Sequence, residues 1–230
     1  MRQIWILLLL PLLLLAQTPL GDRQIQAKLN VLNGAAAECV MHRLYTGTGW
    51  VQIEGEVGRN GIDGLYYKEK KGRITEVLVA ESKWNTSRLG RSGRGKLVKQ
   101  MSKEWVLRTL HKLQQKYPMP EYSRIEALVS AGQYRARLFR LKPKGSDALE
   151  ITIYKIRNKG DRSFDTFLES RLRPIVLNAQ RNPFEVMITR AYNSCRKAGL
   201  HRYFPSLPES AIETLLQDNY LKAKEVRPYL

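Results

Sequence analysis

An acidic and a basic residue follow directly on one strongly apolar segment of the chain. Residues 77–80 (Val-Leu-Val-Ala) form an unbroken apolar run of strand length, and Glu81, Ser82 and Lys83 come immediately after it. Because successive side chains of a strand point to opposite faces, Glu81 and Lys83 share a face and lie about 7 Å apart along the backbone. A carboxylate and an ammonium group in this arrangement can bind a hard cation and stabilise negative charge that develops during a reaction.

A second carboxylate is expected at the same place. Asp63 lies in the segment 61–64 (Gly-Ile-Asp-Gly), which precedes a second strand-like stretch at residues 65–67 (Leu-Tyr-Tyr). The polar residues 68–73 are typical of a turn that joins the two stretches as a hairpin. In such a hairpin Asp63 and Glu81 meet at one end.

Two converging carboxylates favour magnesium as the bound ion, with manganese as the alternative. Zinc would find only scattered ligands in the sequence: His42, His111, His201, Cys39 and Cys195. The backbone carbonyl oxygen of Ser82 is a candidate third ligand beside Asp63 and Glu81.

Phosphodiester hydrolysis places negative charge on the nonbridging and leaving oxygens, which a divalent ion and Lys83 would stabilise. Lys83 could also orient or help deprotonate the attacking water.

The chain is strongly basic. It has 230 residues, of which 39 are Lys or Arg and 21 are Asp or Glu, so its net charge is +18. A charge of this size predicts a polyanionic partner, either nucleic acid or an anionic membrane surface. No long basic amphipathic stretch with a wide apolar face supports the membrane alternative, so we expect nucleic acid.

A glycine-rich basic loop follows the strand that ends at Lys83. Between Lys83 and Glu104 the sequence has six positive residues, three glycines and no acid. Such a loop can lie close against a phosphate backbone; the alternative is a solvated loop without a partner. The residues predicted to contact nucleic acid are Arg88, Arg91, Arg94, Lys96 and Lys99 in this loop, together with Arg135 and Arg137 on one face of a later strand.

Hydropathy patterning predicts an α/β fold of one domain with additions at both ends. A helix with the 3.6-residue period begins at Asp22 and continues to Leu44, after which residues 46–49 (Thr-Gly-Thr-Gly) interrupt it. The other expected elements are strands at 50–53, 65–67, 74–81, 133–141 and 149–156, and helices at 97–117, 164–172, 184–195 and 212–216. The pattern divides the chain into a core at residues 22–160 and a helical extension at residues 161–230.

Residues 1–16 have the pattern of a signal peptide. The segment starts with a positive charge, residues 4–15 are apolar and include Pro11, and Ala16 provides a small residue at the cleavage position. The short length and the internal proline disfavour a membrane span. We therefore expect a secreted or periplasmic protein whose mature chain begins near Gln17, with an uncleaved membrane anchor as the alternative.

The two cysteines, Cys39 and Cys195, lie in apolar helical patterns. Two cysteines are too few for a disulfide framework, so we expect buried free thiols, with a single disulfide as the alternative. Neither thiol is needed for the predicted chemistry. An oxidising compartment would therefore not inactivate the protein.

The order of these motifs resembles a known nuclease superfamily. A helix with an acid precedes a strand, a strand that opens at Asp63, a strand that ends in Glu81-Ser82-Lys83, and a further helix. This order resembles the PD-(D/E)xK superfamily of restriction-endonuclease-like proteins. In one respect the chain departs from the motif, because Ile62 rather than proline precedes Asp63.

Three segments are more narrowly similar to the nuclease domains that end bacterial polymorphic toxins. They are residues 58–64 (Gly-Arg-Asn-Gly-Ile-Asp-Gly), residues 76–84 and residues 100–105 (Gln-Met-Ser-Lys-Glu-Trp). The resemblance covers about residues 33–159. The helices expected after Asp161 lie outside it.

The resemblance implies a restriction-endonuclease-like fold, in which helices flank a mixed β-sheet. The family's Asp and Glu-x-Lys positions fall on Asp63, Glu81 and Lys83. Its first-helix acid falls on Glu38 and its downstream-helix glutamine on Gln100, and both are implied to be catalytic. The resemblance also implies a magnesium-dependent endonuclease that hydrolyses DNA and needs no small-molecule cofactor, with an inhibitor protein as a candidate partner.

Two alternatives to a deoxyribonuclease stay open at this point. RNA presents the same phosphate backbone to a basic cleft, so a ribonuclease is the alternative within the enzyme class. The second alternative is a protein of this fold that binds nucleic acid without cutting it. The presence of Asp63, Glu81 and Lys83 together speaks against that alternative.

Overall fold

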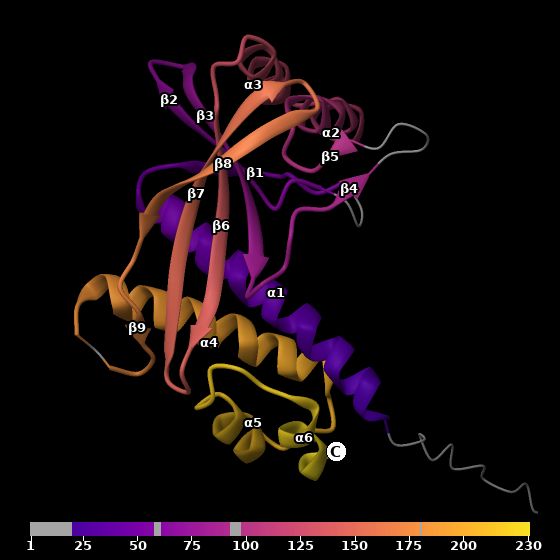
Figure 1. Cartoon of the computed structure of the whole chain (residues 1–230), viewed down its shortest axis with the longest axis vertical. Helices are drawn as coiled ribbons and strands as arrows, with labels where there is room; N and C mark the ends of the chain where they lie inside the picture. The colour runs from indigo at the N-terminus through magenta and orange to yellow at the C-terminus, as the bar shows by residue number, and fades with distance from the viewer. Residues whose placement is uncertain (1–19, 58–60, 93–97, 180) are drawn as a thin grey trace, which may run out of the picture.

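The computed structural model describes residues 20–57, 61–92, 98–179 and 181–230 (Figure 1). The predicted signal peptide lies outside the described residues, as do Arg94 and Lys96 of the basic loop. Within these four described ranges, no helix is both long enough and apolar enough to cross a membrane.

The chain forms a mixed α/β structure, as the hydropathy pattern predicts, in which helices precede, separate and follow two runs of strands. The helices are α1 (Asp22–Gly47), α2 (Lys103–Lys116), α3 (Pro120–Ser130), α4 (Pro183–Tyr203), α5 (Glu209–Leu215), α6 (Ala223–Val226) and the 3-10 turn η1 (Arg227–Tyr229). The strands are β1 (Val51–Ile53), β2 (Gly64–Lys70), β3 (Arg73–Trp84), β4 (Arg91–Ser92), β5 (Val98–Lys99), β6 (Arg135–Lys144), β7 (Ala148–Gly160), β8 (Ser163–Arg171) and β9 (Ile175–Val176).

The described residues build one mixed sheet of seven strands. Its order is β1-β2-β3-β6-β7-β8, with β9 paired to the start of β7, while β4 and β5 form a separate small ribbon. Strands β3 and β6 are parallel, and the other neighbouring strands of the sheet are antiparallel. A mixed sheet flanked by helices is thereby confirmed. The more specific restriction-endonuclease-like fold stays a prediction.

Two apolar clusters hold helices on the two faces of the sheet. Leu78 and Ala80 of β3 point into a cluster with α1 and α4, which run side by side across the lower half of the molecule (Figure 1). Val77 and Val79 point the other way, into a cluster with α2 and α3. Strand β3 is therefore buried on both faces, as its unbroken apolar run predicts.

The predicted helix over residues 164–172 is wrong, because this segment is strand β8, paired with β7 along its length. Phe164, Phe167 and Leu168 follow a helical spacing, but only Phe164 is buried, whereas Phe167 is 46% exposed and Leu168 is 54% exposed. The spacing therefore does not mark a buried helical face. The open edge of β7 provides backbone partners that local sequence cannot reveal, and pairing with it overrides the helical pattern. Residues 161–230 thus contribute strands as well as helices.

The expectation of free thiols is also wrong, because Cys39 of α1 and Cys195 of α4 form a disulfide. Their Cα atoms lie 6.4 Å apart, within the range that a disulfide can bridge. An apolar helical pattern shows that each cysteine is directed inwards, but it cannot show that α1 and α4 pack against each other. A disulfide is typical of proteins that work in an oxidising compartment.

Removing the disulfide should destabilise the fold. We expect replacement of both cysteines by alanine to lower the free energy of unfolding by about 2–4 kcal/mol, because the bond restricts the unfolded chain. Urea unfolding of residues 18–230, with and without a thiol reductant, measures this effect. The reduced wild type should unfold at the same urea concentration as the variant. Equal midpoints of oxidised wild type and variant would show that the bond does not stabilise the fold.

Candidate active site

Three of the predicted catalytic residues, Glu38, Asp63 and Lys83, line one cleft at the end of the sheet. Glu81 and Gln100 are not in its lining, but the Glu81 carboxylate accepts hydrogen bonds from both Lys83 and Gln100. Asp63 lies directly before β2, and Glu81 and Lys83 lie near the end of β3. Glu38 lies in the middle of α1. The cleft has a volume of about 460 Å³, and its lining includes Asn30, Glu38, Asp63, Ser82, Lys83 and Arg88.

The β2–β3 hairpin brings Asp63 to Glu81, as the sequence predicts. The strands are antiparallel and their register pairs Gly64 with Ala80, so Asp63 lies opposite Glu81. The backbone N–H of Ser82 donates a hydrogen bond to Oδ2 of Asp63 at 2.9 Å. This bond fixes the Asp63 carboxylate beside the end of β3.

Glu81 is a buried carboxylate with one oxygen held by the protein. Its side chain is 1% exposed, and Oε1 accepts hydrogen bonds from Nζ of Lys83 and from Nε2 of Gln100, both at 2.5 Å. The second oxygen, Oε2, is buried and has no hydrogen-bond partner. Burial, followed by the nearby Asp63 carboxylate, raises the pKa of Glu81 well above its ordinary value, although Lys83 opposes this shift. No protein group donates a hydrogen bond to this oxygen, and a bound ion or a proton shared with Asp63 would each satisfy it.

Gln100 reaches Glu81 from the basic loop rather than from a helix. It lies after β5 and before α2, so the expected placement on the downstream helix is wrong. Its Oε1 accepts a hydrogen bond from the backbone N–H of Gly90 at 3.2 Å, and its own backbone N–H donates to the Gly90 carbonyl oxygen at 3.0 Å. Gln100 therefore links the basic loop to the Glu81 carboxylate.

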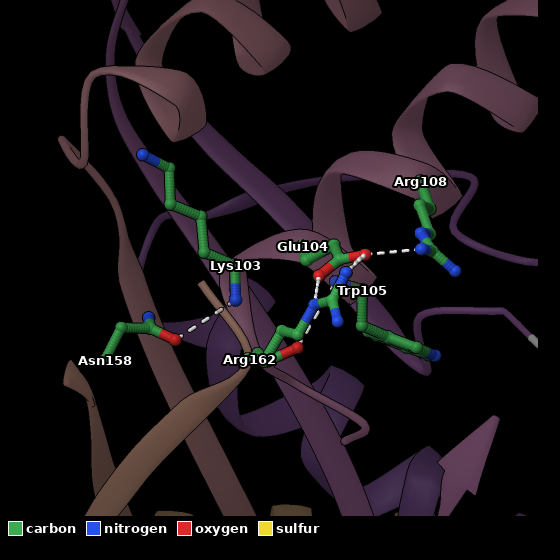
Figure 2. A network of polar contacts seen from close by, with 7 residues as sticks. Lys103, Glu104, Trp105, Arg108, Asn158 and Arg162 are labelled. Atoms are coloured by element: carbon green, nitrogen blue, oxygen red, sulfur yellow. Dashed lines mark hydrogen bonds and ion pairs between the residues drawn. The ribbon is translucent and has the colours of Figure 1, made fainter. Parts of the chain in front are cut away.

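A polar network holds α2, the helix that follows Gln100 (Figure 2). The Glu104 carboxylate forms ion pairs with Arg108 on the same helix and with Arg162 at the β7–β8 turn. The backbone N–H of Lys103 donates to Oδ1 of Asn158 at 3.1 Å. These contacts anchor the start of α2 to the β7–β8 hairpin. The Glu104 carboxylate is neutralised by its two arginine partners, and it does not line the cleft.

Glu38 contributes a third carboxylate to the cleft. Its pKa is raised to about 7, first by burial, then by the negative charges of Asp63 and Glu56, while Lys83 acts in the opposite direction. A carboxylate with this pKa can accept or release a proton near neutral pH.

The residues present fit a divalent cation. The carboxylates of Asp63 and Glu81 lie close enough to raise the pKa of Glu81, and Oε2 of Glu81 lacks a partner. A divalent cation between the two carboxylates would offset their mutual repulsion and would give Oε2 of Glu81 a partner. In the parts of the chain that the structure describes, no three His, Cys, Asp or Glu side chains form a complete ligand group. Magnesium needs no such group, because it is typically held by one or two carboxylates and keeps several waters.

The sequence interpretation missed a hydrogen-bonded pair, the half-buried His42 and the buried Tyr66. Nδ1 of His42 and the hydroxyl of Tyr66 share a hydrogen bond of 2.6 Å. Burial lowers the pKa of His42 and raises the pKa of Tyr66. A Cβ at Gly64 would lie 2.7 Å from the Tyr66 hydroxyl oxygen, so the pair also requires glycine after Asp63. His42 follows Glu38 by one helical turn, and this spacing was a signal in the sequence.

Among the basic loop residues that the structure describes, Arg88 is in the lining of the cleft, whereas Arg91 and Lys99 are not. Arg91 pairs with Lys99 across the β4–β5 ribbon. Nζ of Lys99 lies 4.1 Å from the centroid of the Phe164 ring.

Arg135 and Arg137 do not join the cleft. Arg135 forms an ion pair with Glu76, and Arg137 is 8% exposed and pairs with Glu169. Arg137 is adjacent in sequence to Leu138, whose register partner is Glu81, so Arg137 points to the opposite face of the sheet. Both charges are already paired, and neither placement favours the predicted contact with nucleic acid.

A larger hollow of about 950 Å³ lies between α1 and α4. Arg43, Arg181 and Arg190 line it, but none of the predicted catalytic residues does. Because this hollow has no carboxylate in its lining, we place the candidate active site in the smaller cleft.

Comparison with family models, with curated proteins and with solved structures finds no match to this chain. The nuclease resemblance therefore rests on the motif residues themselves. Their meeting in one cleft is an observation about geometry, and the activity that it supports is proposed below.

Ionisation of Glu38 should destabilise the metal-free protein. Its pKa of about 7 in the fold exceeds the ordinary 4.5, so the folded state holds the proton more tightly and stability falls as pH rises through this window. We expect Glu38→Gln to raise the free energy of unfolding at pH 8 by on the order of 1–3 kcal/mol, with little change at pH 4. Urea unfolding in EDTA at both pH values measures this. The control Glu69→Gln, at the exposed end of β2, should have no effect. A Glu38→Gln protein no more stable than wild type at pH 8 would contradict the raised pKa.

Proposed function

We propose that this chain is a metal-dependent endonuclease that hydrolyses phosphodiester bonds of DNA. The observation that carries the proposal is the Glu81 carboxylate, which is buried against Lys83 and Asp63 and keeps one oxygen without a protein partner. A buried carboxylate of this kind is costly for stability, and such groups concentrate at functional sites. The net charge of +18 supports a polyanionic substrate.

Each cleft residue has a distinct role in this proposal. Asp63 and Oε2 of Glu81, with the backbone carbonyl of Ser82, would hold magnesium, which when bound supplies positive charge at the scissile phosphate. Lys83 orients the attacking water and stabilises the charge that develops on the phosphate oxygens. Glu38, with a pKa of about 7, accepts a proton from water near neutral pH. Gln100 positions Glu81 through its hydrogen bond to Oε1.

The basic loop supplies the contacts that hold the substrate backbone. Arg88 lines the cleft, and the Gln100–Gly90 hydrogen bonds fix the loop against the site. Phosphate contacts of this kind position nucleic acid without reading its sequence. Little base specificity is therefore expected.

The cleavage test compares residues 18–230 with single-site variants on plasmid DNA and on total RNA. We expect Asp63→Asn, Glu81→Gln and Lys83→Ala each to lower hydrolysis by at least about 100-fold, the scale on which single catalytic groups contribute. EDTA should abolish cleavage. Glu76→Gln, at the exposed end of the same strand, is the matched control and should cut normally. A folded Glu81→Gln protein with wild-type turnover would refute the proposed site, and cleavage of RNA alone would identify a ribonuclease.

We also propose that the protein works outside the cytoplasm. The disulfide between Cys39 and Cys195 supports this, because such bonds persist in oxidising compartments. The N-terminal sequence pattern offers the export route. Export would separate a nonspecific nuclease from the chromosome of the cell that makes it, and an inhibitor protein would protect that cell in another way.

Retaining the chain in the cytoplasm should be toxic. In a bacterial host whose cytoplasm permits disulfides, expression of residues 17–230 should stop growth by degrading host nucleic acid, and Glu81→Gln should restore it. Mass spectrometry of the full-length product should find a mature chain that begins near Gln17 outside the cytoplasmic membrane. Intact Met1 on cytosolic protein in normally growing cells would show that this account of localisation is wrong.

A further inference from the structure

Arg140 lies beside the catalytic lysine on the neighbouring strand. The register of β3 and β6 pairs Lys83 with Arg140, and it pairs Glu81 with Leu138. Directly paired residues of adjacent strands project from the same face of a sheet, and the strands lie about 4.8 Å apart. Arg140 therefore projects from the same face as the catalytic lysine.

The Arg140 guanidinium is positioned but its charge is not neutralised. Its Nη2 donates to the backbone carbonyl of Ser87 at 3.1 Å, and Ser87 lines the cleft. Its Nε is buried and has no hydrogen-bond partner. Among the described residues no carboxylate forms an ion pair with Arg140, whereas Arg135 and Arg137 of the same strand are both paired. Arg140 thus contributes a positive charge beside the cleft that no carboxylate of the described residues neutralises.

An aromatic ring and an apolar side chain extend the surface away from the cleft. The guanidinium carbon of Arg140 lies 5.9 Å from the centroid of the half-buried Tyr154 ring. Tyr154 pairs in register with Leu168 of β8, which is 54% exposed. We call Arg140, Tyr154 and Leu168 the Arg140 platform. The acid nearest to it along this face of β7 is Glu150, which pairs in register with Lys142.

The chemistry of the platform matches an unpaired nucleotide. A guanidinium binds a phosphate through paired N–H donors, and aromatic or guanidinium planes stack on exposed bases. In a duplex the bases are stacked and paired inside the helix, so they cannot lie against such a surface without being separated.

We propose that the Arg140 platform binds an unpaired nucleotide of the substrate strand next to the cleft. The phosphate lies on the Arg140 guanidinium and the base lies against Tyr154 and Leu168. The protein therefore binds single-stranded nucleic acid more tightly than intact duplex. This inference rests on the proposed nuclease function, which it deepens by naming the substrate class.

Binding without cleavage tests the platform. Fluorescence anisotropy in EDTA compares a labelled single strand of twelve nucleotides, as DNA and as RNA, with a hairpin duplex of the same sequence. Wild type should bind at least one single strand at least about fivefold more tightly than the duplex, the lower limit for stacking of one base. Tyr154→Leu and Arg140→Lys should each lower single-strand affinity by at least about fivefold, since one removes the ring and the other removes the planar cation.

Conservative and remote variants provide the controls. Tyr154→Phe keeps the ring and should bind like wild type. Arg135→Lys alters a matched arginine, 5.7 Å from the Trp50 ring at the other end of β6, and should also bind like wild type. Circular dichroism checks that each variant folds. If Tyr154→Leu does not fold, the comparison of Arg140→Lys with Arg135→Lys decides whether the platform binds the single strand.

The outcomes separate this inference from the proposed function. Equal affinity for single strand and duplex, or wild-type affinity of the folded platform variants, would overturn the platform even if wild type cuts DNA in magnesium. Preferential single-strand binding that depends on Arg140 would support the platform even if wild type cuts nothing.

Discussion

The burial of Glu81 against Lys83 is the constraint on which the rest of the structure depends. A carboxylate that is 1% exposed destabilises a fold unless charged and polar groups compensate it, and here Lys83 and Gln100 do so from two directions. The free-energy cost of burying Glu81 is offset because apolar clusters pack against both faces of β3. The same burial raises the pKa of Glu81, so a metal ion that binds there has to displace a proton.

Three elements must be correctly placed for the site to exist, and each is fixed by a different kind of interaction. The β2–β3 hairpin places Asp63 through strand register and through the hydrogen bond from Ser82. Helix α1 places Glu38 by packing on the sheet. The loop before α2 places Gln100 through backbone bonds to Gly90 and through the network around Glu104 (Figure 2). No single stretch of sequence contains the site.

Local sequence predicted the parts of the site that depend on alternation and short hairpins. The apolar run before Glu81 and the turn after the second strand were sufficient to bring Asp63 and Glu81 together, because register is set by neighbouring residues. Local sequence failed where the partner is distant. The edge of β7 converts residues 163–171 from an apparent helix into a strand, and the packing of α1 on α4 joins Cys39 to Cys195. The parallel pairing that sets Arg140 beside Lys83 was equally inaccessible, because fifty-six residues separate them in the chain.

The disulfide joins the candidate active site to the C-terminal part of the chain. Cys39 is adjacent to Glu38, and its bond leads to Cys195, which lies beyond the segment that resembles known nucleases. The C-terminal third of the chain is thus covalently attached one residue away from Glu38, and it also supplies the strand that carries Leu168. A fragment that ends at residue 159 would keep Glu38, Asp63 and Lys83 of the cleft. It would lose the disulfide that holds α1, the helix that carries Glu38. The segment that carries the motifs is therefore shorter than the structural unit that holds the candidate site in place.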